Sequence, residues 1–251
     1  GLIWGLMAIG VYITFRILDV ADLTVDGSLA TGGAVAVMLI RAGMNAWLAL
    51  LCAFLAGMLA GFVTGLFHTK CGIPAILAGI LTQLSLYSIN LRIMGTKANQ
   101  AVSVDKYDLL VSQRYVLKLT LNNPLPLLLL FTAVLIAALY WFFGTEKGCS
   151  LRATGANQNM ARAQGINTNV AKVLGLMISN GLVALAGALL SQYQGFSDIN
   201  MGRGAIVIGL AAVIIGEVIF GKVFHNFGLK LLAAVFGAII YYIVIQFVLR
   251  M

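Results

Sequence analysis

Eight uncharged stretches follow one another along the chain, separated by polar segments. Five of them have about the 20 residues that an α-helix needs to cross a bilayer: 46–67, 73–91, 125–143, 173–197 and 231–249. Three are shorter: 1–15, 27–40 and 204–216. The strict alternation of apolar and polar residues that marks membrane strands is missing. The pattern therefore predicts an all-α integral membrane protein with about eight helical segments.

The composition agrees with lipid as the solvent of these segments. Of the 251 residues, 61% are hydrophobic and only 10% are charged, whereas soluble domains carry about 25% charged residues. The net charge of +8 comes from basic residues scattered through the polar segments without interleaved aromatic residues. This distribution favours anionic lipid headgroups as the partner and argues against nucleic acid.

No cluster of residues in the sequence indicates catalysis or metal binding. Cys52, Cys71 and Cys149 lie far apart and form no CxxC pair, and His68 stands alone at the end of an apolar stretch. The segment GEVIFGK (216–222) resembles a phosphate-binding loop, but no hydroxyl residue follows its lysine and no strand precedes it. We therefore expect no metal, no cofactor and no catalytic residue, with any ATP hydrolysis on a separate subunit.

Small and polar residues within the apolar stretches indicate how the helices pack. Gly57, Gly61 and Gly65 recur at a spacing of four residues, which is typical of close contact with a neighbouring helix. Amides and hydroxyls at membrane depth must face protein or a water-filled path. Hydrogen bonding between helices and lining of a substrate pathway remain equal alternatives for these side chains, which are Ser28, Thr31, Thr82, Gln83, Ser85 and Asn180.

The two short internal stretches resemble one another. DGSLATGGAVAVMLI (26–40) and GRGAIVIGLAAVIIG (202–216) are both Gly-rich and follow a polar turn. Short, Gly-interrupted segments at matching places in two halves are typical of transporters built from repeats. We interpret the chain as one transmembrane domain, 1–251, with halves of about 1–122 and 123–251. Asp26 either lies in a solvated turn or shapes the start of the first short segment.

The polar segment 144–170 is more structured than a simple connection requires. Its sequence, GTEKGCSLRATGANQNMARAQGINTNV, predicts a small helix flanked by turns. Asn157 is suited to begin this helix, Ala161 and Ala163 favour it, and Gly165 is suited to end it. Residues 95–122 form a second long polar segment that holds a β-like stretch, 107–121. Segments 144–172 and 95–122 carry four basic residues each, so charge bias leaves the orientation open.

The stretch SLRATGANQNMARAQGINTNVAK (150–172) resembles the cytoplasmic coupling segment of ATP-binding-cassette importer permeases. The family concerned is the branched-chain amino acid and ribose permease superfamily. DLTVDGS (22–28) and LYSINLRIMG (86–95) are most similar to its tryptophan/tyrosine-type permeases. The resemblance implies that one set of residues in this stretch couples the permease to its ATPase. These residues are Arg152, Ala153, Thr154, Gly155, Asn157, Met160, Ala161, Arg162, Gly165, Ile166 and Asn167.

The resemblance implies a type II-like importer permease that moves a small polar solute, expected to be an amino acid, across the bacterial cytoplasmic membrane. It further implies a homodimer with the path near its axis and two ATPase subunits on 150–167. An extracytoplasmic binding protein is expected to reach loops such as 95–122 and 195–203. The family has another helix after 231–249, so we expect a trimmed chain. The alternatives are an ion-coupled transporter, a membrane-embedded enzyme and a structural subunit.

Overall fold

The computed structural model describes residues 2–17, 22–42, 46–95, 99–101, 124–194, 196–198, 205–220 and 227–250. The α-helices in these ranges are α1 (Leu2–Tyr12), α2 (Val25–Arg41), α3 (Ala46–Thr69), α4 (Ala75–Ile93), α5 (Pro124–Phe143), α6 (Glu146–Ala156), α7 (Gln158–Ala163), α8 (Thr168–Gln194), α9 (Ala205–Phe220) and α10 (Phe227–Arg250). A π-helical turn, η1 (Ile13–Ile17), continues α1, and two short strands are β1 (Asn99–Ala101) and β2 (Phe196–Asp198).

All eight apolar stretches predicted to be helical form helices, so the predicted fold class is confirmed. Four of them, α3, α4, α8 and α10, are long and apolar enough to cross a membrane, and α5 joined to α6 gives a fifth candidate with a bend of 81°. Because α1, α2 and α9 are shorter, none of them crosses a bilayer by its own length. The predicted β-like stretch 107–121 lies outside the described residues.

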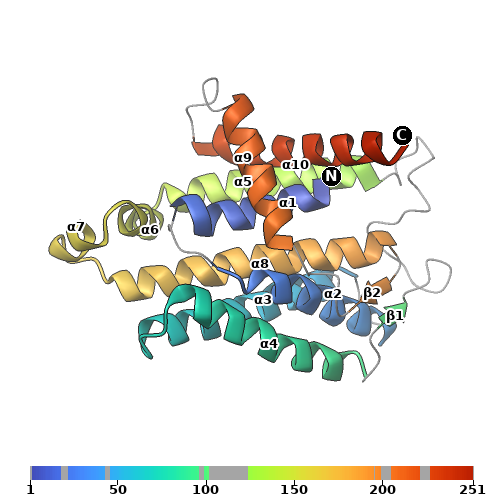
Figure 1. Ribbon diagram of the computed structural model, residues 1–251, viewed down its shortest axis with the longest axis horizontal. Helices are drawn as coiled ribbons and strands as arrows, with labels where there is room; N and C mark the ends of the chain where they lie inside the picture. Colours follow the sequence, from blue (N-terminus) through green and yellow to red (C-terminus); the bar gives the residue numbers. More distant parts are fainter. Residues whose placement is uncertain are drawn as a thin grey trace.

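Most helices lie side by side, with α8 in the interior of the bundle (Figure 1). Helices α6 and α7 lie at one end of the bundle, called here the α6–α7 end. Strands β1 and β2 lie at the opposite end, called here the strand end (Figure 1). Helix α9 runs across the direction of its neighbours and contacts α1 and α10. The fold therefore presents two distinct faces, one helical and one built from loops and strands.

Helix α3 packs on α8 through the predicted glycine stripe. A methyl group at position 57 would lie 2.4 Å from the carbonyl oxygen of Asn180, and one at position 61 would lie 2.4 Å from that of Leu176. At Gly65 the nearest atom belongs to Val173, at 2.9 Å. The two backbones therefore approach as closely as glycine permits, and the predicted role of the stripe is confirmed.

Helix α2 approaches α8 in the same way, next to α3, which it also contacts. A methyl group at Gly32 would lie 1.9 Å from the carbonyl oxygen of Ala184, and one at Gly187 would lie 2.0 Å from that of Leu29. Each helix thus supplies a glycine to the contact. Helices α2, α3 and α8 therefore pack against one another, with little freedom for α8 to change its distance from either neighbour.

Strands β1 and β2 join two loops that are far apart in the sequence. They pair antiparallel, with Asn99 opposite Asp198, Gln100 opposite Ser197 and Ala101 opposite Phe196. The first loop follows α4 and the second follows α8. The two polar loops expected on one side of the membrane therefore meet at the strand end.

Replacement of Gly61 by alanine tests the α3–α8 contact. Helix propensity alone would stabilise the variant by about 1 kcal/mol. The contact with the Leu176 carbonyl instead predicts a net destabilisation of about 1–3 kcal/mol, because backbone atoms must move apart. Thermal unfolding in detergent measures the sign. Gly144→Ala is the matched control, since its nearest atom would be at an ordinary 3.4 Å. A higher melting temperature for Gly61→Ala than for the wild type would refute the contact.

Candidate functional site

A buried carboxylate lies between α2 and α8. Asp22 is 1% exposed and precedes α2 by three residues. Its Oδ1 accepts a hydrogen bond from the backbone N–H of Thr24 at 3.0 Å, and its Oδ2 accepts one from the Asn180 amide at 2.8 Å. The carboxylate therefore shapes the turn that starts α2 and binds this turn to the middle of α8.

Asn180 uses all of its side-chain polar atoms. Its Oδ1 accepts a hydrogen bond from the Ser28 hydroxyl at 2.6 Å, and its Nδ2 donates both to Asp22 and to the Leu176 carbonyl oxygen, the latter at 2.9 Å. Asn180 is 0% exposed. A buried amide without partners would cost several kcal/mol in lipid, so this set of bonds explains why an asparagine is tolerated at this depth.

Two further bonds connect α2 to other helices. The Thr24 and Thr64 hydroxyls lie 2.7 Å apart, and Thr64 belongs to α3. The Thr31 hydroxyl lies 2.7 Å from Oδ1 of Asn90, which belongs to α4, and 2.9 Å from the Gly27 carbonyl oxygen. Together with the bonds of Asp22, Ser28 and Asn180, these contacts form a set of buried polar groups called here the buried network.

Asp26 links α2 and α9, the two short helices whose sequences resemble one another in composition. It lies in the first turn of α2, one residue after the start of the helix. Its Oδ1 accepts a hydrogen bond from the backbone N–H of Ile206 at 3.0 Å, in the first turn of α9. The carboxylate thus satisfies one of the free N–H groups at the start of α9. Asp26 therefore shapes the start of α9, whereas Asp22 shapes the start of α2.

The six side chains proposed for a substrate pathway occupy different environments. Ser28, Thr31, Thr82 and Asn180 are buried, and each makes a hydrogen bond within the bundle. Gln83 is half-buried and Ser85 is exposed. Within one chain, the four buried side chains form hydrogen bonds between helices or within one helix. A role of any of the six in a pathway stays a prediction.

The polar segment forms two short helices in place of the one predicted. The Thr145 hydroxyl oxygen accepts a hydrogen bond from the Gly148 N–H and starts α6. Asn157 has extended backbone angles, φ −161° and ψ 107°, which interrupt the helix. Its Oδ1 then accepts the N–H of Met160 at 3.2 Å and starts α7. The predicted capping role of Asn157 is confirmed, and the same residue explains the unpredicted break.

Gly165 and Asn167 form the junction to α8. Gly165 has φ +87°, a left-handed conformation that suits glycine and ends α7 as predicted. Asn167 Oδ1 accepts the N–H of Val170 at 3.3 Å in the first turn of α8. Between these residues, the Arg162 Nε donates to the Thr168 hydroxyl at 2.9 Å. The segment is therefore a fixed structure with defined turns.

The residues predicted to couple the chain to an ATPase divide into an inner and an outer set, and their coupling role stays a prediction. Thr154 and Ala161 are buried and attach the segment to the bundle. Ala153, Gly155 and Ile166 are partly buried. The exposed residues are Arg152, Asn157, Met160, Arg162, Gly165 and Asn167. Met160, with 50% of its surface exposed, gives this outer face an apolar centre among polar groups.

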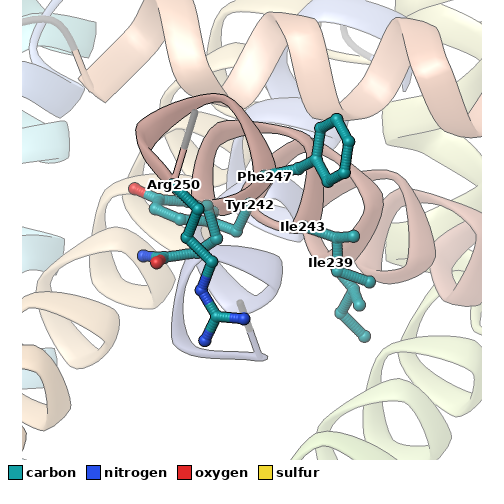
Figure 2. Close-up of a pocket in the computed structure, with 6 residues that line it drawn as sticks. Ile239, Tyr242, Ile243, Phe247 and Arg250 are labelled. Atoms are coloured by element: carbon teal, nitrogen blue, oxygen red, sulfur yellow. The ribbon is translucent and has the colours of Figure 1, made fainter.

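A groove lies along the C-terminal half of α10, between Ile239 and Arg250. Its volume is about 430 Å³, and Ile239, Ile243 and Phe247 line one wall (Figure 2). Tyr242 and Arg250 lie on the other, and Tyr242 stacks on Trp4 of α1. None of the lining residues belongs to the buried network.

The described residues hold no group of three or more His, Cys, Asp or Glu side chains placed to bind a metal ion. The Nδ1 of His68 lies 2.9 Å from the Ile73 carbonyl oxygen, so this ring closes the turn between α3 and α4. Gly216–Phe220 of the phosphate-loop-like stretch belong to the end of α9. Helix, not a loop, therefore occupies that part of the stretch.

Comparison with known proteins matches the whole chain to one family. The sequence profile of one protein family, the permease component of branched-chain amino acid transport systems, matches residues 1–251. A tyrosine transport system permease protein of Clostridioides difficile (strain R20291) is 41% identical over 250 residues, which are 100% of this chain and 81% of that protein. An uncharacterized protein, RP368, of Rickettsia prowazekii (strain Madrid E) is 37% identical over 239 residues, 95% and 82% of the two chains.

A more distant relative matches a shorter part of this chain. The autoinducer 2 import system permease protein LsrC of Yersinia pestis (strain Pestoides F) is 31% identical over 218 residues, which are 85% of this chain and 58% of that protein. Among solved structures, PsaBC from Streptococcus pneumoniae in complex with a Fab matches 95% of this chain and 87% of that chain, with 16% identity and a TM-score of 0.47.

Exchange of the two side chains at positions 22 and 180 tests the buried network. Asn180→Asp places a second carboxylate against Asp22 and is expected to destabilise the protein by about 3 kcal/mol or more. Asp22→Asn with Asn180→Asp restores one amide and one carboxylate, so most of the loss should be recovered. Thermal unfolding of both single variants and the double variant gives the coupling energy. Additive effects would show that the two residues do not interact.

Proposed function

Because the chain belongs to the permease components of branched-chain amino acid transport systems, we propose that it carries an amino acid inward as the permease subunit of an ATP-binding-cassette importer. The match over residues 1–251 is the observation that carries this proposal. The membrane-length helices agree with its place in the cytoplasmic membrane of a bacterium. ATP is hydrolysed on a separate subunit, and this chain supplies the path.

An amino acid is the substrate class that the relatives favour. The family description names branched-chain amino acids, and the relative with 41% identity is described as a tyrosine transport system permease. The hydroxyls and amides of the buried network are engaged with one another. These groups therefore do not indicate which amino acid, distinguished by its side chain, is the substrate. Substrate selection falls to the binding protein that delivers the amino acid.

The α6–α7 end is the docking face for the ATPase subunits and faces the cytosol. Its inner residues Thr154 and Ala161 attach it to the bundle, and its turns are fixed by Asn157 and Gly165. A push on such a fixed segment moves α5 and α8, to which it is joined. Met160 is the apolar centre of the contact. Arg152 lies on the same exposed segment and suits an acidic side chain on the ATPase.

The strand end faces outward and receives the binding protein. The pairing of β1 with β2 holds the starts of both outer loops, 95–122 and 195–203, at one place. A partner that binds there contacts the ends of α4 and α8 together. The binding protein is thus able to sense and change the separation of these two helices.

A second copy of the chain packs on the outer face of α4, with the substrate path between the copies. Leu81, Leu84, Ser85 and Ser88 are exposed and share one face of α4. Hydroxyl groups and small residues favour contact between membrane helices over contact with lipid. The exposed face of α5, in contrast, is built from Leu, Val and aromatic side chains that suit lipid.

This arrangement gives the six pathway candidates two roles. Ser85 lies directly on the α4 face, and the half-buried Gln83 lies beside it. Thr82 lies on the inner side of the same helix. Ser28, Thr31 and Asn180 hold the helices behind α4 in place through the buried network. We expect Gln83 and Ser85 to contact the amino acid and the other four to position the helices that form the path.

Met160→Asp tests the docking of the ATPase. A carboxylate in the centre of an apolar contact is expected to lower both uptake and substrate-stimulated ATP hydrolysis at least tenfold, the effect of losing about 1.4 kcal/mol of binding. Both rates are measured in proteoliposomes with the complete importer. Cys71→Asp adds the same charge at an exposed position on the α3–α4 turn and should leave both rates unchanged. Unaltered coupling in Met160→Asp would place the ATPase elsewhere.

The same proteoliposomes separate the importer from an ion-coupled transporter. Uptake should stop when ATP is removed and continue when an ionophore collapses the ion gradients. An ion-coupled transporter needs ionisable residues within its spans and gives the reverse result. Uptake that depends on ion gradients alone would overturn the proposed function.

Cysteine cross-linking tests the face on which the second copy packs. In a background with Cys52, Cys71 and Cys149 changed to serine, Ser85→Cys or Ser88→Cys should form a disulfide dimer in membranes under mild oxidation. A disulfide forms only where two Cα atoms approach within about 7 Å. Val134→Cys, on the exposed face of α5, is the control and should remain monomeric. Cross-linking through α5 and not through α4 would refute the proposed interface.

A further inference from the structure

A lysine near the start of α8 is buried, and no acidic side chain pairs with it among the residues that the structure describes. Lys172 is only 8% exposed, and among the described residues the one charged group that acts on it is the cation Arg162. Lysine is almost never buried to this extent unless it is paired. Helices α6 and α7 and the turn η1 all contact α8, so this lysine lies at a junction of several elements at the α6–α7 end.

Arg162 is held next to this lysine. Its Nε donates to the Thr168 hydroxyl at 2.9 Å, which fixes the guanidinium at the first residue of α8. Arg162 is exposed, and a guanidinium carries further N–H groups in a planar fork that recognises phosphate and carboxylate. Two fixed cations in repulsion indicate that an anion belongs between or beside them.

The start of α8 adds a third source of positive potential. The first N–H groups of a helix carry a partial positive charge, which disfavours a lysine in this region and favours an anion. Asn167 satisfies only the N–H of Val170 with its side chain. Arg162, Lys172 and the helix terminus therefore repel one another, and each would be stabilised by the same negative group.

The depth of the site matches the phosphate layer of a bilayer. Helix α8 has 27 residues, about 40 Å at 1.5 Å per residue, whereas the hydrocarbon core is about 30 Å thick. If the helix is centred in the membrane, Lys172 lies at the edge of the hydrocarbon and Arg162 lies beyond it. Val170, 61% exposed, gives an apolar surface beside the two cations. The carboxylate of a cytosolic protein would have to pass the headgroup layer to reach Lys172.

We propose that Arg162, Lys172 and the first turn of α8 form a binding site for the phosphate group of an anionic phospholipid in the cytoplasmic leaflet. The lipid phosphate neutralises both cations, and its acyl chains lie along the apolar surface of the bundle. The site joins α7 to α8 through one lipid molecule. It is separate from the substrate path, and its place in the cytoplasmic leaflet rests on the proposed function, which puts the α6–α7 end in the cytosol.

Native mass spectrometry of the purified chain, without ATPase, tests the site. Released from nanodiscs that contain equal amounts of phosphatidylglycerol and phosphatidylcholine, the wild type should retain phosphatidylglycerol selectively. Lys172→Met keeps the apolar stem and removes the charge, and it should lower the retained phosphatidylglycerol at least about fivefold, the effect of one basic residue near an anionic surface. Lys172→Arg should restore retention. The thermal unfolding of all variants identifies any that fail to fold.

Lys147→Met is the matched control, because Lys147 is exposed at the same end of the bundle, outside the proposed site. Retention should be unchanged in this variant and lowered in Arg162→Ala. Equal retention in all variants would overturn the site. Displacement of the lipid by inorganic phosphate at millimolar concentration would assign the site to free phosphate. Unchanged lipid retention in Lys172→Met, combined with weaker ATPase binding, would assign it to an acidic side chain of the partner.

Discussion

The hydrogen bond between Asp22 and Asn180 is the contact on which the arrangement of the bundle depends. In hydrocarbon, polar groups must find their partners within the protein. Asp22 fixes the turn before α2, and Asn180 lies at the middle of α8, 158 positions away. The bond therefore ties a helix that begins inside the bundle to the helix at its centre. The bonds of Ser28 and Thr24 then complete a set in which each polar group has a partner.

Close packing of glycines and the buried network act on the same helices. The glycines of α2 and α3 set the distance to α8, whereas the hydrogen bonds set the position of α2 along α8. Small residues supply contact area in lipid, where apolar burial gives little driving force between helices. The polar bonds add direction, because a shift of one helical turn would leave a carboxylate and an amide unpaired. The combination defines one packing of three helices.

The fold was largely predictable from the sequence, and the partners of the polar residues were not. Hydropathy and length predicted all eight apolar helices, because lipid imposes a simple rule on composition. Local signals at Asn157 and Gly165 predicted the turns around α7. Asn180 was recognised as a residue that must face protein, but its bond to Asp22 depends on tertiary structure that one sequence does not contain. Thr64 and Asn90 were not chosen as site residues for the same reason, and the break after Ala156 depended on an extended residue that composition does not reveal.

The hydrogen bond between the Asp26 carboxylate and the N–H of Ile206 joins the starts of the two short helices, α2 and α9. Neither α2 nor α9 crosses the membrane by its own length, so each has one end within the bundle, and these inner ends meet at this bond. Helix α9 also contacts α1 and α10, and α2 contacts α8. The carboxylate therefore connects the packing of α1, α9 and α10 to that of α2 and α8 without a covalent bond, so that a movement of α9 relative to α8 has to break this bond or carry the first turn of α2 along.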